Sequence, residues 1–334
     1  MKILVIGGTI FLGRHIVDSL LENGHEVWLF NRGKHNPELF GEKVKTVIGD
    51  RENLEDLKLL TGEQFDSIID TCAYFPETVE KSLKVFRNNS NQYVFISTVS
   101  VYRDEKSIGI KEDYPLAKLQ ENTDLSKITH ENYGPLKARC EKMVLSYFPK
   151  NSLIIRPGYI IGPYDLFDRF NCWISYAYNK LPLLCPGDGE DKIQFIDVRD
   201  LADWIVKSIF AEINGIFNAC GESKKFIDFI QACKDSAGSK QPIIHIPVDY
   251  ISENNLFSEL AIYCPNSGDY LGYCQTDNNK AKNQSLIFRE YSKTFKDIYQ
   301  LHLSRGKDYI MNAGLSDEKY RKILDDLEKI KTKS

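Results

Sequence analysis

Residues 2–21, KILVIGGTIFLGRHIVDSLL, decide the fold class. The apolar run Lys2–Ile6 predicts a buried strand, and the apolar spacing of Arg14–Leu21 predicts an amphipathic helix. Between them stand Gly7, Gly8 and Gly13, which permit a tight turn and let a pyrophosphate approach the N-terminus of the helix. An ordinary glycine-rich turn is the alternative, but strand, turn and helix in this order predict a dinucleotide-binding βα unit.

The first half of the chain repeats this unit, because short apolar runs alternate with amphipathic stretches. The expected strands are Ile3–Ile6, Glu26–Phe30, Val44–Ile48, Ser67–Asp70, Tyr93–Ser97 and Leu153–Arg156. Helices are expected near 11–22, 52–60, 77–88 and 134–147. Continuous apolar strands suit a parallel sheet covered on both faces, so we predict an α/β fold with a Rossmann-type, doubly wound parallel sheet. The charged stretch 103–132 breaks this rhythm, and we expect it to be a loop at the rim of an active site.

The composition changes after Arg156, where residues 157–194 are rich in Gly, Pro, Tyr and Trp. We therefore expect a dinucleotide-binding domain over 1–156, and a smaller C-terminal substrate-binding lobe over 157–334 that is partly interleaved with the sheet. The expected elements of this second part are helices near 168–179, 199–211, 224–236, 292–304 and 316–331 and a strand at Ile243–Ile246.

Composition and charge exclude several classes of protein. The 334 residues include 43 lysines and arginines against 47 acids, a formal charge of −4, which disfavours nucleic acid as a partner. No window approaches the ~18 apolar residues of a membrane span, and the N-terminal residues do not resemble a signal peptide, so we expect a cytoplasmic protein without a membrane partner. The eight cysteines form no C-x-x-C pair, and we expect buried thiols and no metal site.

A second sequence signal comes from Tyr133 and Lys137, a Y-x-x-x-K pair at the start of a predicted helix. A spacing of four places both side chains on one helical face. A free tyrosine titrates near ~10, about 3 units above neutral pH, and a neighbouring ammonium favours its phenolate. The pair therefore predicts a tyrosine that acts as a general base and a lysine that lowers its pKa.

The glycine-rich turn and this pair resemble the short-chain dehydrogenase/reductase superfamily, in its extended, NAD-dependent epimerase/dehydratase-like branch. The family turn reads T-G-G-x-G-F-x-G, whereas this chain has Ile6 for the threonine and Ile10 for the middle glycine, which indicates an atypical subgroup. The segment Ser97–Tyr102 is similar to the family's S-[ST]-x-x-V-Y strand end. On that alignment Thr98 is the hydroxyl that orients the substrate oxygen beside Tyr133, with Ser97 and Ser100 as alternatives. The resemblance covers essentially the whole chain.

The cofactor is expected to be NADP, with NAD possible. A carboxylate at the end of the second strand would hold the ribose diol of NAD, whereas a basic residue accommodates the 2′-phosphate of NADP. Asn31 stands at the acidic position and Arg32 follows it, although Arg32 could be only a solvated loop charge. From the turn and the resemblance together, the predicted cofactor-binding residues are Gly7, Gly8, Thr9, Phe11, Leu12, Gly13, Asn31, Arg32, Asp50, Arg51, Thr71, Cys72, Ala73, Pro157 and Gly158.

The substrate is not identified by the sequence. Family members that act on nucleotide sugars place arginines where this chain has Gln194 and Asn266, and the loss of both would weaken diphosphate binding. The segments expected to surround the substrate are aromatic instead: Tyr74, Phe75, Tyr164, Phe167, Phe170, Trp173, Tyr176 and Tyr178, some of which must belong to the core. Of these, Tyr74, Phe75 and Tyr164, together with Ser100, are the predicted substrate contacts.

Three functions follow from these observations. We expect an NAD(P)-dependent oxidoreductase or epimerase that uses Thr98, Tyr133 and Lys137 on a hydroxyl or carbonyl carbon of a small substrate. The alternatives are a nucleotide-sugar epimerase or dehydratase, and a non-catalytic or RNA-binding member, because chloroplast stem-loop RNA-binding proteins carry a similar G-G-T-x-F-x-G turn. The resemblance also implies a homodimer that pairs through helices near 77–88 and 134–147.

Overall fold

The computed structural model describes residues 1–306 and 309–333, which form two compact units. The first unit comprises Met1–Ile160, Ile196–Gly221 and Thr276–Phe288. The second comprises Ile161–Phe195, Glu222–Gln275 and Arg289–Ser334. The predicted boundary lay after Arg156, and the contacts of the chain assign two later segments to the first unit as well.

The first unit contains a seven-stranded sheet in which every neighbouring pair is parallel. Its order is β10-β6-β5-β4-β1-β2-β3. The strands are β1 (Lys2–Ile6), β2 (Glu26–Asn31), β3 (Lys45–Ile48), β4 (Phe65–Asp70), β5 (Ser90–Ile96), β6 (Ser152–Arg156) and β10 (Gly215–Asn218). The predicted doubly wound α/β fold is therefore confirmed.

The strand order reverses between β1 and β4, because the chain runs outward from β1 through β2 to β3 and then returns to the other side of β1. Ligands of such sheets bind beyond the carboxyl ends of the strands at this switch point. The loops that follow Ile6 and Asp70 lie there, since these two residues pair directly across the two strands.

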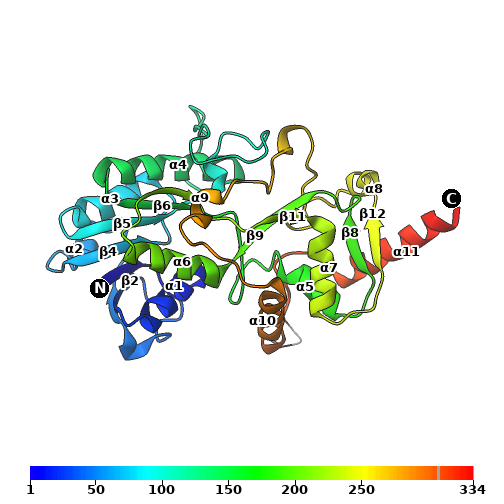
Figure 1. Cartoon of the computed structure of the whole chain (residues 1–334), viewed down its shortest axis with the longest axis horizontal. Helices are drawn as coiled ribbons and strands as arrows, with labels where there is room; N and C mark the ends of the chain where they lie inside the picture. The colour runs from blue at the N-terminus through cyan, green and yellow to red at the C-terminus, as the bar shows by residue number, and fades with distance from the viewer. Residues whose placement is uncertain (307–308, 334) are drawn as a thin grey trace. The chain divides into compact units, whose positions relative to one another are not determined.

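Two layers of helices cover the sheet (Figure 1). Hydrophobic clusters place α1 (Phe11–Glu22) and α6 (Val198–Phe210) on one face. They place α2 (Leu54–Lys58), α3 (Pro76–Phe86) and α4 (His130–Tyr147) on the other. The shorter elements of this unit are η1 (Gly41–Lys43), η2 (Val99–Val101) and α9 (Asn279–Lys282). Strand β7 (Tyr159–Ile161) follows β6 in the chain, includes the boundary between the units and belongs to the separate three-stranded sheet β11-β9-β7.

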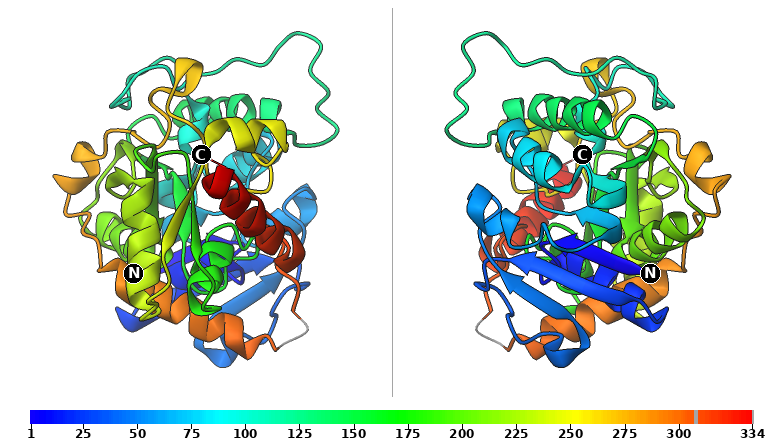
Figure 2. Two further views of the ribbon diagram at one scale, coloured as in Figure 1. Left: turned by 90° about the vertical axis from the view of Figure 1, so that its right-hand side faces the viewer. Right: turned by 90° about the vertical axis from the view of Figure 1, so that its left-hand side faces the viewer.

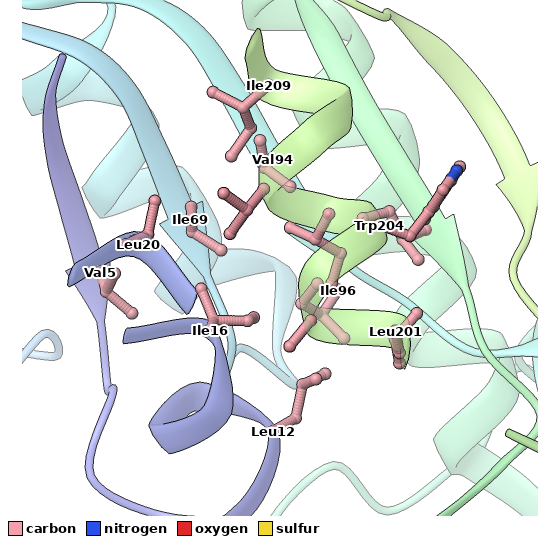
Figure 3. Close-up of a cluster of buried hydrophobic side chains, with 14 of the residues drawn as sticks. Val5, Leu12, Ile16, Leu20, Ile69, Val94, Ile96, Leu201, Trp204 and Ile209 are labelled. Carbon is pink, nitrogen blue, oxygen red and sulfur yellow. The ribbon is translucent and has the colours of Figure 1, made fainter. Parts of the chain in front are cut away.

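The spacing of apolar residues explains why α1 packs as it does. Leu12, Ile16 and Leu20 recur every fourth residue, so they form one stripe of the helix, and all three are buried. Figure 3 shows this stripe between the sheet residues Val5 and Ile69 and the side chains of α6. This cluster is the main hydrophobic core on that face of the sheet.

Strand β10 was not predicted from the sequence. Its four residues read Gly-Ile-Phe-Asn, which is too short for a periodic pattern and carries a glycine and an asparagine that disfavour strands. It forms because Gly215–Asn218 pairs in register with Leu153–Arg156 of β6 and completes the edge of the sheet.

The second unit is held by an aromatic core. Phe170, Phe195 and Phe229 meet edge to face, and Trp173 packs on Phe226 and Phe229. Phe170, Trp173 and Tyr176 are therefore core residues, as was expected for some of the aromatic set. The elements are α5 (Asn171–Tyr178), β8 (Leu183–Pro186), β9 (Lys192–Asp197), β11 (Ser223–Lys225), α7 (Phe226–Ser236), β12 (Ile243–Ile246), α8 (Val248–Glu253), η3 (Gly268–Tyr270), α10 (Tyr291–Ser304) and α11 (Asp317–Lys333).

A loop is present between η2 and α4, but it is shorter than the predicted range 103–132, because the capping box at Thr129 starts α4 at His130. Residues 103–129 contain no regular element, and an isolated bridge between Tyr102 and Leu116 fixes the start of the loop. Figure 2 shows the loop projecting beyond α4. Across the residues that the structure describes, all eight cysteines are free thiols, no cluster of potential metal ligands is found, and no helix could cross a membrane.

The core of the first unit gives a stability prediction. Ile16 is fully buried against the sheet, so Ile16→Ala should lower the free energy of unfolding by about 2–5 kcal/mol. Ile48, at the end of the edge strand β3, is 57% exposed, and Ile48→Ala should change the free energy of unfolding by less than about 1 kcal/mol. Urea unfolding followed by circular dichroism measures both values, and equal losses would contradict this assignment of the core.

Candidate active site

The turn between β1 and α1 has the geometry that a pyrophosphate needs. Gly7 and Gly8 have φ angles of +103° and +93°, which residues with a side chain rarely adopt. A Cβ on Gly13 would lie only 2.9 Å from the backbone nitrogen of Gly8, so this position also requires glycine. No side chain caps the N-terminus of α1, because its N-cap residue is Ile10. The first amide groups of α1 are thus available to an anion, and this turn fits a dinucleotide.

The end of β2 is tied to this turn by two asparagines. Asn31 accepts a hydrogen bond from the backbone amide of Gly33 at 2.9 Å, and its amide donates to the Gly7 carbonyl at 3.4 Å. Asn36 donates to the carbonyl of Thr9 at 3.0 Å. Arg32 is exposed beside them, and within the described residues its guanidinium has no ion-pair partner. The position is that of a residue free to meet a ligand phosphate.

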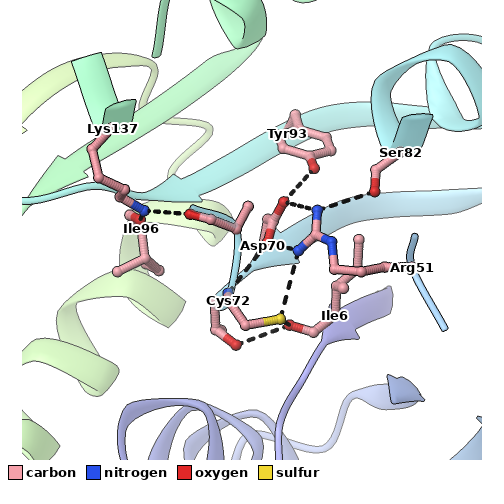
Figure 4. A network of polar contacts seen from close by, with 10 residues as sticks. Ile6, Arg51, Asp70, Cys72, Ser82, Tyr93, Ile96 and Lys137 are labelled. Atoms are coloured by element: carbon pink, nitrogen blue, oxygen red, sulfur yellow. Dashed lines mark hydrogen bonds and ion pairs between the residues drawn. The ribbon is translucent and has the colours of Figure 1, made fainter. Parts of the chain in front are cut away.

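Arg51 lies inside the fold instead of at the surface of the cofactor turn. Its guanidinium donates to both carboxylate oxygens of Asp70, at 2.5 and 2.7 Å, and to Ser82 Oγ at 3.1 Å (Figure 4). Tyr93 donates its hydroxyl to the same carboxylate at 2.8 Å. Asp50, which precedes Arg51, accepts the amide of Glu52 with its carboxylate.

The loop after β4 lies against the cofactor turn. Thr71 donates its hydroxyl to the carbonyl of Ile6 at 2.9 Å, and the thiol of Cys72 contacts the same oxygen at 3.6 Å. Burial raises the pKa of the Cys72 thiol, so this cysteine is neutral at physiological pH. Thr71 and Cys72 are therefore fixed beside Gly7.

Helix α4 positions the tyrosine–lysine pair. Thr129 begins the helix as the first member of a capping box with Asn132, and Tyr133 follows in the first turn. Lys137 is only 4% exposed, and its ammonium donates to the carbonyls of Ala73 at 2.9 Å and Ile96 at 2.5 Å. Burial lowers the pKa of Lys137 to about 8. The ring of Tyr133 lies near that of Tyr74, with 6.3 Å between centroids.

The predicted hydroxyl groups lie against the same helix. Thr98 is buried and accepts the backbone amide of Ser100 at 3.1 Å, while its hydroxyl donates to Ser100 Oγ at 3.2 Å. Ser100 is exposed. A Cβ on Gly134 would lie 1.9 Å from the carbonyl oxygen of Ser100, so η2 touches α4 one residue beyond Tyr133. The segment Thr98–Ser100 thus lies against the part of α4 that carries Tyr133 and Lys137.

A buried ion pair beneath these groups was not predicted. Glu141 and Arg156 are each 1% exposed and are joined by two hydrogen bonds, from Arg156 Nε at 2.9 Å and from Nη2 at 2.6 Å. Ser97 also donates to Glu141, at 2.5 Å, and Arg156 donates to the hydroxyl of Tyr102 at 3.0 Å. The spacing of four between Lys137 and Glu141, which continues the helical stripe, is the sequence signal that could have found it.

The remaining predicted residues fall in both units. In the first, the Pro157 carbonyl accepts the amide of Val99 at 3.0 Å, which joins the ends of β5 and β6 beside Gly158. Phe75 precedes α3 as its N-cap. Tyr164 belongs to the second unit and has a φ angle of +70°.

The two positions without an arginine both belong to the second unit. Gln194 is buried in β9, opposite Ser223 of β11. Asn266 shapes its own loop, because it accepts the amide of Lys192 and donates to the carbonyl of Tyr273 at 2.9 Å. Both side chains are therefore built into the fold of this unit.

Comparison with known proteins identifies the family. The profile of the NAD dependent epimerase/dehydratase family matches residues 3–220, which is most of the chain. The chain belongs to this family. Membership confirms the predicted class of NAD(P)-dependent enzyme of the short-chain dehydrogenase/reductase type, and it gives NAD as the dinucleotide of the family.

Individual relatives differ in what they are named for. The chain is 30% identical over 267 residues to the chloroplast stem-loop binding protein of 41 kDa b of Arabidopsis thaliana, covering 73% of this chain and 65% of that protein, just under two thirds. It is 25% identical to UDP-glucose 4-epimerase of Neisseria meningitidis serogroup B, over 72% of this chain and 84% of the enzyme. The fold matches UDP-glucuronic acid 4-epimerase from Bacillus cereus, solved with UDP-glucuronic acid and NAD, with a TM-score of 0.66 at 19% identity over 92% and 100% of the two chains.

The close contact between η2 and α4 gives a stability prediction. Gly134→Ala should destabilise the protein by about 3 kcal/mol, because the new methyl group would overlap the Ser100 carbonyl. Gly62→Ala is the matched control, since no atom lies within 4 Å of the Cβ position there, and its effect should stay below about 1 kcal/mol. Thermal and urea unfolding compare the two, and a Gly134→Ala protein as stable as the control would refute the close contact.

Proposed function

We propose that this protein is an NADP(H)-dependent oxidoreductase or epimerase that acts on a hydroxyl or carbonyl carbon of a small substrate. The observation that carries the proposal is the convergence of Tyr133, Lys137 and the Thr98–Ser100 hydroxyls on the start of α4, next to the loop that touches the cofactor turn. Bound nicotinamide would supply the group that accepts or donates the hydride.

The residues of the chain handle the proton of the substrate hydroxyl. Tyr133 removes it as phenolate and returns it in the reverse direction. Lys137 is held on the same helical face, and its positive charge favours the phenolate. Since the pKa of Lys137 is about 8, the ammonium loses its charge as the pH rises through that value, and the support for the phenolate is lost with it. The hydroxyls of Thr98 and Ser100 orient the substrate oxygen.

The preference for NADP(H) is supported by Arg32. The exposed guanidinium stands directly after β2, where the 2′-phosphate of NADP is recognised in such folds. Asn31 carries an amide in place of the carboxylate that would hold a ribose diol, and this amide is hydrogen-bonded to Gly7 and Gly33. Arg51, by contrast, donates its hydrogen bonds within the protein, and we assign it no direct contact with the cofactor.

A nucleotide sugar is the second candidate substrate. It is favoured by the Neisseria and Bacillus relatives, whose names specify UDP-sugars. Against it stand Gln194 and Asn266, which occupy the two positions where the family resemblance implies diphosphate-binding arginines. The Arabidopsis relative is named for stem-loop binding, but the formal charge of −4 and the intact Tyr133–Lys137 pair favour an enzyme.

Replacement of the catalytic tyrosine tests the chemistry. Tyr133→Phe should lower turnover by about 10³-fold or more, because the general base is lost, while the affinity for NADPH changes by less than about threefold. The assay follows the absorbance of NADPH at 340 nm. The absorbance should fall when NADPH is mixed with a carbonyl substrate and rise when NADP⁺ is mixed with an alcohol. Epimerisation of UDP-glucose and UDP-glucuronic acid is measured in parallel. Retention of full activity would exclude Tyr133 as the base, and activity on UDP-sugars alone would select the second candidate.

Replacement of Arg32 tests the cofactor. Arg32→Ala should weaken NADPH binding by about tenfold or more and leave NADH binding nearly unchanged, because only NADPH carries the phosphate that the guanidinium contacts. Arg139→Ala, which removes an exposed arginine of α4, is the control and should alter neither. Fluorescence titration gives the four dissociation constants. If Arg32→Ala weakened the binding of NADPH and NADH equally, or weakened neither, Arg32 would not be the residue that recognises the 2′-phosphate.

A further inference from the structure

The Arg51–Asp70 ion pair joins parts of the sheet that are not neighbours. Arg51 follows β3 at the edge, whereas Asp70 ends β4, and β1 and β2 lie between these strands. The Asp70 carboxylate is fully buried and the Arg51 side chain is 10% exposed. The pair therefore links the edge of the sheet to its switch point through a geometry that only the two-pronged guanidinium can make.

Stability alone does not account for this pair. Taking two charges out of water costs nearly as much as their attraction returns, so a buried ion pair is weak evidence of stabilisation. In addition, Arg51 Nε is buried without a hydrogen-bond partner among the described residues. A pair that is costly to bury and incompletely satisfied is better explained by what it holds in place.

The pair holds the loop that fixes Lys137. Asp70 accepts the backbone amide of Cys72 at 3.3 Å, and Arg51 Nη1 reaches the thiol of Cys72 at 3.5 Å. The next residue is Ala73, whose carbonyl accepts a hydrogen bond from the Lys137 ammonium. On the other side Cys72 contacts the carbonyl of Ile6, directly before the cofactor turn.

We propose that Arg51 and Asp70 are positioning residues that set the loop Thr71–Ala73 for two tasks, to hold Lys137 and to support the cofactor turn. The inference rests on the proposed function, since it assigns these residues to the site that binds the dinucleotide. Neither residue touches the cofactor or the substrate; both act through Cys72 and Ala73.

The charges around Lys137 provide a signature that a merely structural role would lack. Lys137 is surrounded by charged or titratable groups from three elements: Cys140 and Glu141 of α4, Asp70 and Cys72 at the end of β4, and Arg51 after β3. Asp70 raises the pKa of Lys137 and Arg51 lowers it. Removal of the Asp70 charge should therefore lower this pKa, whereas mere loosening of the fold would admit water and raise it.

The first test is cofactor affinity in the full-length chain. Arg51→Lys keeps the charge but loses the fork, so NADPH should bind about tenfold more weakly. Arg103→Lys is the matched control, because it makes the same change in the ion pair between Arg103 and Asp104, and Arg103 is largely exposed. This variant should bind NADPH as tightly as the wild type. An Arg51→Lys protein with wild-type affinity overturns the proposal. If the wild type itself binds neither NADPH nor NADH, the proposed function fails instead.

The second test follows the ammonium directly. In protein labelled with ¹³C,¹⁵N-lysine, the Lys137 signal is assigned by its absence in Lys137→Met and titrated by NMR. Asp70→Asn should move the midpoint down by about one unit, since it removes a nearby negative charge. An unchanged or higher midpoint overturns the proposal. If Asp70→Asn does not fold, the proposal is decided by comparing the NADPH affinities of Arg51→Lys and Arg103→Lys.

Discussion

The Lys137 ammonium, held by two buried backbone carbonyls, is the interaction on which the site depends. Ala73 and Ile96 end or follow two neighbouring strands, β4 and β5, and their carbonyls can meet one ammonium because parallel strands end at the same edge of the sheet. A helix that presents Lys137 to this edge must also present Tyr133, one turn earlier. The position of the Tyr133–Lys137 pair is thus a consequence of strand order.

Two buried ion pairs surround this interaction. Arg51–Asp70 fixes the loop that carries the Ala73 carbonyl, and Glu141–Arg156 joins α4 to the end of β6 and, through Ser97, to the end of β5. Each carboxylate is satisfied by several donors, which is the condition for keeping a charge inside a protein. These buried hydrogen bonds support the groups to which we assign the proton transfer.

Family membership and the site constrain the function to different degrees. The family defines a dinucleotide-dependent enzyme, and the intact Tyr133–Lys137 pair agrees with it. We propose that the second unit distinguishes this chain from relatives named for nucleotide sugars, because Gln194 and Asn266 stand where the family resemblance implies diphosphate-binding arginines. The substrate is therefore the property in which this chain is expected to depart from those relatives.

The local pattern of residues in the sequence by itself determined much of the secondary structure of this protein. The strand, glycine turn and helix of residues 2–21, the alternating βα units and the Tyr133–Lys137 stripe were all predictable, because each depends on residues close together in the chain. Strand β10, by contrast, exists only because β6 offers it a partner, and Gly134 matters only because Ser100 lies against it.

The same distinction applies to the contacts of Arg51. Its position after β3 suggested a cofactor contact, but its partner Asp70 lies 19 residues away, and the two meet only when the sheet is assembled. Sequence periodicity reports which face of an element is buried. It does not report which distant charges will share that buried space, because this depends on strand order and helix packing, and only the tertiary structure decided it.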